Sequence, residues 1–199
     1  MVLDTAAELF ATHGVSKTST NRIAAEAGIS IGTVYRYFPD RSAIVDELLN
    51  RMLDDLERGF DAVRPTVVAD LSDETRPPED RYSAAMHRIL TVFNSALVEN
   101  AGLVRAFVST VQFYASNLPQ FEKRLHAMLA QILQLGTGDD ETTETICMVV
   151  VNTAFAVVVR TAVSNDADSD CIDELGMACR MLGLWLARTM ITDSVSRAQ

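Results

Sequence analysis

Hydroxyl, amide and guanidinium side chains gather between residues 18 and 41 of this chain. Such groups donate hydrogen bonds to phosphate oxygens and to the edges of bases, so their chemistry is that of a nucleic-acid interface. Two further positions belong to the same surface: one offers only apolar contact, such as to a thymine methyl group, and one is a glycine. The candidates are Thr20, Asn21, Ile31, Gly32, Thr33, Tyr35, Arg36, Tyr37 and Arg41.

Two short helices separated by a glycine turn would position these side chains. Ile23, Ala24 and Ala27 form an apolar stripe at helical spacing. Gly28 follows, and glycine enters the left-handed conformation that turns a chain sharply after a helix. Ser30 is a good N-cap for the second helix.

The second helix is predicted to run from Ser30 to Phe38. Val34 and Phe38 are four residues apart and would face inward, which leaves the hydroxyl and guanidinium groups outside. Pro39 ends the helix, and Asp40 caps the next one. An apolar stripe over residues 3–11, ending at Gly14, predicts a further helix upstream. This arrangement would lay one helix into the major groove of DNA, which makes DNA binding the first hypothesis.

The chain resembles the TetR-type bacterial transcriptional regulators. The resemblance is carried by AAELFATHG at 6–14, TSTNRIAAEAGIS at 18–30 and IGTVYRYFPDRSAIV at 31–45. It implies an all-α fold of about nine helices. Residues 1–45 would form a three-helix bundle with a helix-turn-helix DNA-binding domain. Residues 46–199 would form a helical effector-binding and dimerisation domain that pairs through its last two helices.

The resemblance also implies roles for single residues. Thr20 stands where relatives contact a phosphate, Asn21 where they reach a base edge, and Arg41 where they carry a lysine. Thr33, Tyr35 and Tyr37 stand on the face that contacts DNA. Two departures matter: Ile31 replaces a lysine or another polar residue, and no basic arm precedes Met1, so a minor-groove contact is not expected.

Structural roles are the alternatives for several of these side chains. Tyr35 and Tyr37 are also suited to packing, and Arg36 to a solvated surface. Thr18 and Ser19 are as well suited to capping the first of the two short helices as to contacting DNA.

The charge of the chain is unusual for a DNA-binding protein, with a formal net value of −10. The acidity lies mostly elsewhere, because residues 17–41 hold four basic and two acidic residues, whereas residues 52–199 hold 12 basic and 21 acidic ones. A face with so little positive charge should bind random DNA weakly, because backbone neutralisation sets non-specific affinity.

The rest of the chain is expected to be helical. A fourth helix should run from Asp40 to about Ala62, and residues 64–80 should form a loop around Pro65, Pro77 and Pro78. The valine triplets at 149–151 and 157–159 have strand propensity, but the length of their segment favours helix. The further helices are expected from near Glu79, around Leu103 to Tyr114, from Phe121 to Gly136, from Asp139 to Ser164 and from Asp168 to Ile191.

An apolar cavity for a small molecule is expected among these helices. Aromatic side chains, flexible thioethers and a few polar tips are typical of such cavities, although plain core packing is the alternative for each. Asn152 is the most distinctive candidate, because it is polar within an apolar run. The candidates are Met86, Phe93, Phe107, Val111, Tyr114, Met128, Asn152 and Phe155.

By resemblance, the ligand-free homodimer binds a palindromic operator and represses. A small, largely apolar ligand would favour a state with altered spacing of the recognition helices. Two alternatives are a DNA-binding regulator controlled by a protein partner and a small-molecule enzyme. The histidines are isolated, and no catalytic motif such as GxSxG, HExxH or a P-loop occurs, which argues against the enzyme.

No metal or cofactor is expected. The three cysteines form no CxxC pair, which gives no indication of a zinc site or a disulfide framework. The uncharged run at 145–159 has 15 residues, short of the roughly 20 that span a bilayer. With no signal peptide apparent, a reducing cytoplasm is the expected location.

Overall fold

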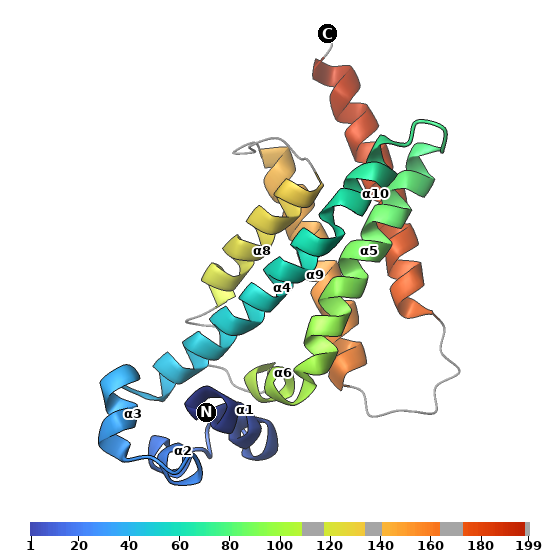
Figure 1. The fold of residues 1–199 in the computed structure, drawn as a ribbon. Coiled ribbons are helices and arrows are strands. Elements are labelled where there is room, and N and C mark those ends of the chain that lie inside the picture. Colours follow the sequence, from blue (N-terminus) through green and yellow to red (C-terminus); the bar gives the residue numbers. More distant parts are fainter. Residues whose placement is uncertain (109–117, 134–140, 164–172, 198–199) are drawn as a thin grey trace.

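The computed structural model describes residues 1–108, 118–133, 141–163 and 173–197, and the regular elements within these ranges are all helices. This confirms the predicted all-α fold. Labelled as in Figure 1, the helices are α1 (Val2–His13), α2 (Thr20–Glu26), α3 (Ile31–Tyr37), α4 (Arg41–Ser72), α5 (Pro78–Glu99), α6 (Ala101–Val108), α8 (Leu118–Ile132), α9 (Glu141–Val163) and α10 (Glu174–Arg197).

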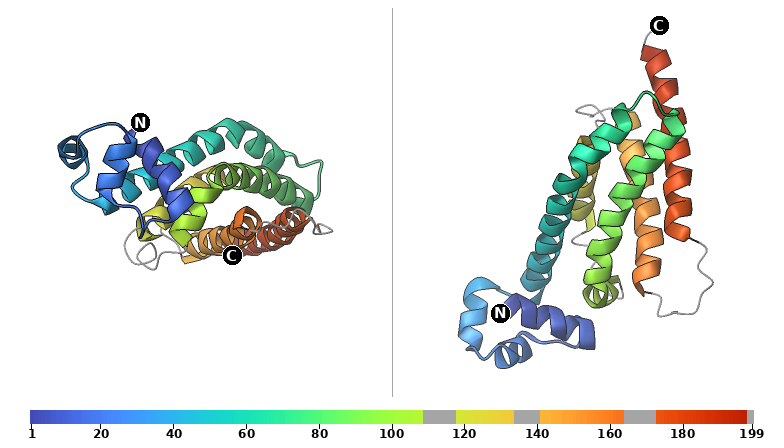
Figure 2. Two further views of the ribbon diagram at one scale, coloured as in Figure 1. Left: turned by 90° about the horizontal axis from the view of Figure 1, so that it is seen from below. Right: turned by 45° about the vertical axis from the view of Figure 1, so that its right-hand side comes forward.

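The helices form a small N-terminal unit and an elongated body. Helices α1, α2 and α3 lie together at one end, and α4, α5, α8, α9 and α10 run along the body (Figures 1 and 2). Helix α4 runs from the small unit into the body, and α6 packs against α1. One buried apolar cluster extends through both parts. None of the described helices is long and apolar enough to cross a membrane.

Helix α4 is longer than its sequence predicted. The expected loop over 64–80 is wrong in its first half, because the helix continues through Pro65 to Ser72. Proline removes one backbone donor, and an isolated helix tends to break there. Here burial stabilises the continued helix: Val67 is completely buried, and Arg81 donates from Nη1 to the Leu71 carbonyl at 3.0 Å.

Helices α5, α8 and α9 agree with their predicted positions to within a few residues. Helix α6 starts at Ala101, and the predicted end at Tyr114 lies outside the described residues, whereas α10 continues past the predicted end at Ile191 to Arg197. Helix α5 starts with Pro78 at its first turn, where a missing N–H costs nothing. Helix α9 starts at Glu141 and keeps both valine triplets helical, as predicted. Helix α10 starts at Glu174, and the earlier start predicted at Asp168 lies outside the described residues.

Two glycines allow helices to cross closely. A Cβ atom on Gly183 of α10 would lie 2.6 Å from the backbone nitrogen of Ser83 in α5. On Gly102 of α6 it would lie 2.7 Å from the Cβ of Ala11 in α1. Real Cβ atoms do not approach so closely, so any larger residue would push the helices apart.

Replacing Gly183 by alanine should therefore destabilise the body, although alanine favours helix more than glycine does. We expect a loss of about 1–3 kcal/mol in the free energy of unfolding, as is usual for overpacking. Urea unfolding followed by circular dichroism measures it. The control is Gly32→Ala, where a new Cβ would meet only the Ser30 Oγ at 3.9 Å. A Gly183→Ala variant as stable as the wild type would contradict the close crossing.

Candidate nucleic-acid interface and apolar cavity

The turn between α2 and α3 forms as the residue types predicted. Ser19 caps α2 by accepting from the Arg22 N–H at 3.2 Å. Gly28 has a φ of +67°, the left-handed conformation that glycine adopts without strain. Ser30 caps α3 by accepting from the Thr33 N–H at 3.1 Å. These local interactions fix where α3 begins and how it leaves the turn.

Burial decides which face of α3 is free. Val34 is 1% exposed and belongs to the core, and Phe38 is half-buried against it. On the other side, Arg36 is exposed, and Tyr35 and Tyr37 keep 50% and 70% of their surface in solvent. Because these three side chains lie outside the core, they are available to a partner.

Hydroxyl pairs connect the two short helices and the cap. The Thr20 hydroxyl at the start of α2 lies 3.1 Å from the Tyr35 hydroxyl of α3. The Thr33 hydroxyl lies 2.8 Å from that of Ser30. These contacts hold the side chains in place before any partner arrives. The hydroxyl oxygens of Thr20, Thr33 and Tyr35 each keep a lone pair for a further hydrogen bond.

The other predicted interface positions surround this group. Asn21 is exposed on α2, and Gly32 is exposed on α3. Ile31 does not stand free: it is half-buried and packs against the core. The predicted contact with a thymine methyl would be limited to the part that remains outside.

Thr18 has neither of the roles considered for it. It is completely buried, and its hydroxyl donates to the Gly14 carbonyl at 3.0 Å, with the Leu9 carbonyl at 3.4 Å. It therefore ties the segment before α2 to the end of α1. The spacing of residues did not reveal this, because the bond depends on how α1 packs.

Arg41 is also partly used within the protein. Its Nη1 donates to the carbonyl oxygens of Ser16 at 3.1 Å and Thr18 at 3.3 Å. The resemblance implied only a DNA contact at this position, where relatives carry a lysine. Its internal bonds could not be read from the sequence, since they join positions more than 20 residues apart.

An ion pair on the surface joins the small unit to α4. Arg51 of α4 lies 2.5 Å from the Asp4 carboxylate of α1. Hydrogen bonds from the chain's terminal amine and from Arg51 lower the pKa of Asp4 to about 2. Both partners are exposed, so the pair contributes little stability, but it keeps Asp4 charged.

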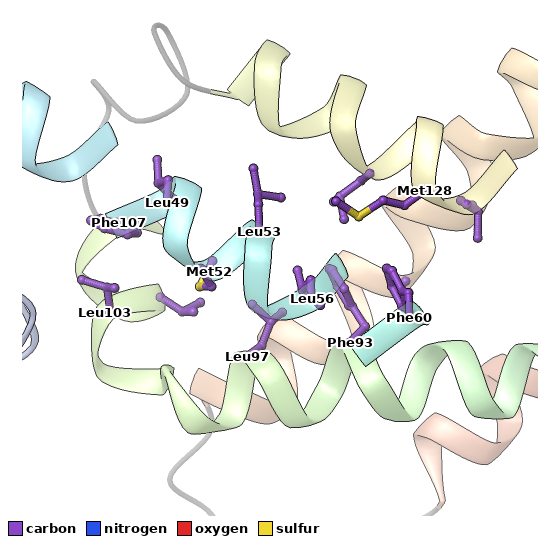
Figure 3. Close-up of a cluster of buried hydrophobic side chains, with 14 of the residues drawn as sticks. Leu49, Met52, Leu53, Leu56, Phe60, Phe93, Leu97, Leu103, Phe107 and Met128 are labelled. Carbon is purple, nitrogen blue, oxygen red and sulfur yellow. The ribbon is translucent and has the colours of Figure 1, made fainter. Parts of the chain in front are cut away.

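The body contains a small apolar cavity between α4, α5, α8 and α9. It has a volume of about 320 Å³, including the part open to solvent, and only aliphatic and aromatic side chains line it. Figure 3 shows part of this region, with Phe60 and Phe93 side by side and Met128 facing them from α8. The lining residues are Phe60, Ile89, Leu90, Phe93, Leu125, Leu129, Val150, Val151 and Ala154.

Of the predicted cavity residues, only Phe93 is among those that line this cavity. Met86, Phe107 and Met128 are buried in the surrounding core, and Phe155 is half-buried. Asn152 is exposed on α9 and does not face the cavity. Val111 and Tyr114 lie outside the described residues.

Sequence reasoning missed most of the lining because it favoured unusual side chains. The actual lining consists of leucine, isoleucine, valine, alanine and phenylalanine, which also fill ordinary cores. The one available signal was position: Ile89 and Leu90 lie one turn from the predicted Met86 and Phe93. Which turn of a helix faces the cavity depends on how the neighbouring helices cross.

The outer faces of α9 and α10 carry apolar side chains in solvent. Met177, Met181 and Leu184 follow one another at helical spacing on α10, each 45–55% exposed. Met148 of α9 is 47% exposed. We call these four residues the α9–α10 apolar face. Exposed apolar side chains at helical spacing, as on α10, are typical of a surface that a partner covers.

The described cysteines lack the lowered pKa of a reactive thiol. Burial raises the pKa of the Cys147 thiol to about 11, and burial, with the nearby Asp173, raises that of Cys179 to about 11. Both therefore stay protonated at neutral pH. Among the residues that the structure describes, no three histidine, cysteine or acidic side chains lie close enough together to hold a metal ion.

Residues 2–48 match the family described as bacterial regulatory proteins, tetR family. The chain is 28% identical, over 138 residues, to the HTH-type transcriptional repressor KstR2 of Rhodococcus jostii (strain RHA1). That match spans 69% of this chain and 64% of the relative, so it covers less than two thirds of KstR2.

Solved structures share the whole fold. A TetR-family transcriptional regulator from Streptomyces coelicolor matches with a TM-score of 0.63 and 22% identity, over 94% of this chain and 96% of that one. The fatty acid degradation regulator FadR from Bacillus halodurans matches with a TM-score of 0.63 and 19% identity, over 94% and 92% of the two chains. At such identities, the likeness concerns the fold alone.

Proposed function

Since the chain belongs to the TetR family of bacterial regulatory proteins, we propose that it is a ligand-responsive repressor that binds a palindromic operator as a homodimer. The observation that carries the proposal is the free face of α3, where Tyr35, Arg36 and Tyr37 are exposed. Residues 1–45 form the DNA-binding domain, and residues 46–199 bind the effector and the second subunit. A protein that acts on the chromosome in this way works in the cytoplasm.

The geometry supports contact with both the backbone and the bases of DNA. The hydroxyls of Thr20, Thr33 and Tyr35 are fixed in place, as suits phosphate contacts that set register. Arg36 is an exposed guanidinium on the same helix and is suited to bidentate contact with guanine. Selection of bound sequences from a random DNA pool tests the proposal, and the expected product is a two-fold symmetric consensus.

Replacing Arg36 by alanine should cost about 1–3 kcal/mol of operator binding for each half-site and relax specificity at one base pair, because a bidentate contact is lost. Fluorescence anisotropy against a set of single-base operator variants measures both effects. Arg58→Ala is the control, since Arg58 is exposed on the body and pairs with Asp55. Equal effects of the two substitutions would contradict base reading by Arg36.

Dimerisation through α9 and α10 is supported by the α9–α10 apolar face. Exposed leucine and methionine side chains on a continuous helical stripe gain free energy when a second copy covers them. A two-fold pair would also place two α3 helices about one turn of DNA apart, or a multiple of that, which matches a palindromic site.

Leu184→Glu should convert the homodimer to a monomer, because a carboxylate would be buried without a partner at the interface. Light scattering at micromolar concentration gives the mass, and operator affinity should fall with it. Val98→Glu is the control, because Val98 is 48% exposed on α5. A Leu184→Glu variant that remains dimeric would show that another surface pairs the subunits.

The cavity supports an effector that is uncharged and apolar. Its lining offers no polar or charged side chain, so a charged ligand would lose its hydration without gaining a partner. Only about 20 Å³ of this space can be occupied by the centre of a water-sized molecule, which is room for about one water, so an effector would have to move the surrounding helices apart.

Filling the cavity should abolish the response to such a ligand. Ala154→Leu adds three carbon atoms at the cavity wall and should leave the operator-bound state intact. An apolar ligand that releases wild-type protein from the operator should then have no effect on the variant, as measured by operator titration. Ala62→Leu, at an exposed position of α4, is the control. Release of the Ala154→Leu variant at wild-type ligand concentrations would place the effector elsewhere.

A further inference from the structure

The segment that leads into α2 is held from two sides. The buried hydroxyl of Thr18 bonds the Gly14 carbonyl at the end of α1. From the opposite side, Arg41 at the start of α4 donates from one nitrogen to the carbonyls of Ser16 and Thr18. Thr20, whose hydroxyl lies 3.1 Å from that of Tyr35, is two residues farther along the chain than Thr18.

From these contacts, and resting on the proposed function, we infer that Arg41 is a positioning residue for DNA binding. Its guanidinium fixes the N-terminus of α2 to the N-terminus of α4, and so sets where Thr20 and Tyr35 stand. Its effect on affinity comes through this placement, and its phosphate contact contributes less.

The arrangement links the two ends of the helix-turn-helix. Helix α3 lies between α2 and α4 in the chain. The Arg41 hydrogen bonds join the segment before α2 to the start of α4, so they connect the two segments that flank the helix-turn-helix. A carbonyl oxygen bonded to a cationic donor is held more firmly than one bonded to water or to a neutral group. The segment that leads into α2 therefore keeps its position relative to α4, and the exposed face of α3 keeps one geometry.

The charge and the shape of Arg41 can be tested separately. Lysine keeps the charge, but its Nζ ends one bond short of the position of the arginine Nη1. Arg41→Lys should therefore weaken the two carbonyl bonds and retain phosphate attraction. If Arg41 positions α2, this variant should lose about tenfold in operator affinity, as expected for the loss of charge-assisted hydrogen bonds. Binding to a random duplex of equal length should change less than twofold.

Hydrogen exchange gives a readout that needs no DNA. In the free full-length protein, the amides of residues 16–20 should exchange several-fold faster in Arg41→Lys than in the wild type. Thermal unfolding should show that the variant remains folded. Unchanged exchange would overturn the inference, and so would operator affinity within twofold of the wild type.

The salt dependence of binding identifies a phosphate contact directly. Loss of one such contact lowers the slope of log affinity against log salt by about 0.9 per subunit. Arg41→Ala should change this slope no more than Lys17→Ala, which removes one exposed charge from the same segment. A drop of about 0.9 beyond that control would assign Arg41 to phosphate contact and overturn the inference. If the wild-type protein selects no DNA sequence, the proposed function fails, and the exchange rates still report whether Arg41 holds the segment.

Discussion

Helix α4 is the constraint on which the rest of the structure depends, because it belongs to both parts of the molecule. Ile44 and Leu48, in its first turns, are buried under the N-terminal unit. Farther along, Leu56 and Phe60 are buried in the body (Figure 3). A single helix of 32 residues joins these sites, and no proline interrupts its hydrogen bonding between Ile44 and Phe60, which keeps this part stiff. Movement of α4 at the cavity is therefore transmitted to the N-terminal unit that holds α3.

A second connection joins the same two parts. Helix α1 meets α6 where Ala11 approaches Gly102, and only Asn100 separates α6 from α5. The cavity is bounded by Phe60 of α4 and Phe93 of α5, so both connections begin at helices that line it. A ligand that changes the spacing of α4 and α5 acts on the N-terminal unit from two sides. Under the proposed function, such a molecule would shift the population of operator-binding geometries only as far as it prefers one of them.

Local features of the structure were accessible from the residues alone. Ser30 and Asp40 cap their helices, and Gly28 adopts a positive φ, because each interaction lies within a few residues of the chain. The exposed face of α3 also followed from spacing, since Val34 defines the buried side. These are the parts on which the family resemblance and the physical argument agreed.

The sequence by itself determined the helices, their caps and the side of α3 that faces solvent, because hydrogen bonds and periodicity act over short stretches of chain. Only the tertiary structure decided that α4 passes through Pro65, that Arg41 bonds Ser16, and that Asn152 lies outside the cavity. Each of these depends on contacts between segments far apart in the chain. The free energy of such contacts is set by how helices cross, and residue type and spacing do not specify the crossing.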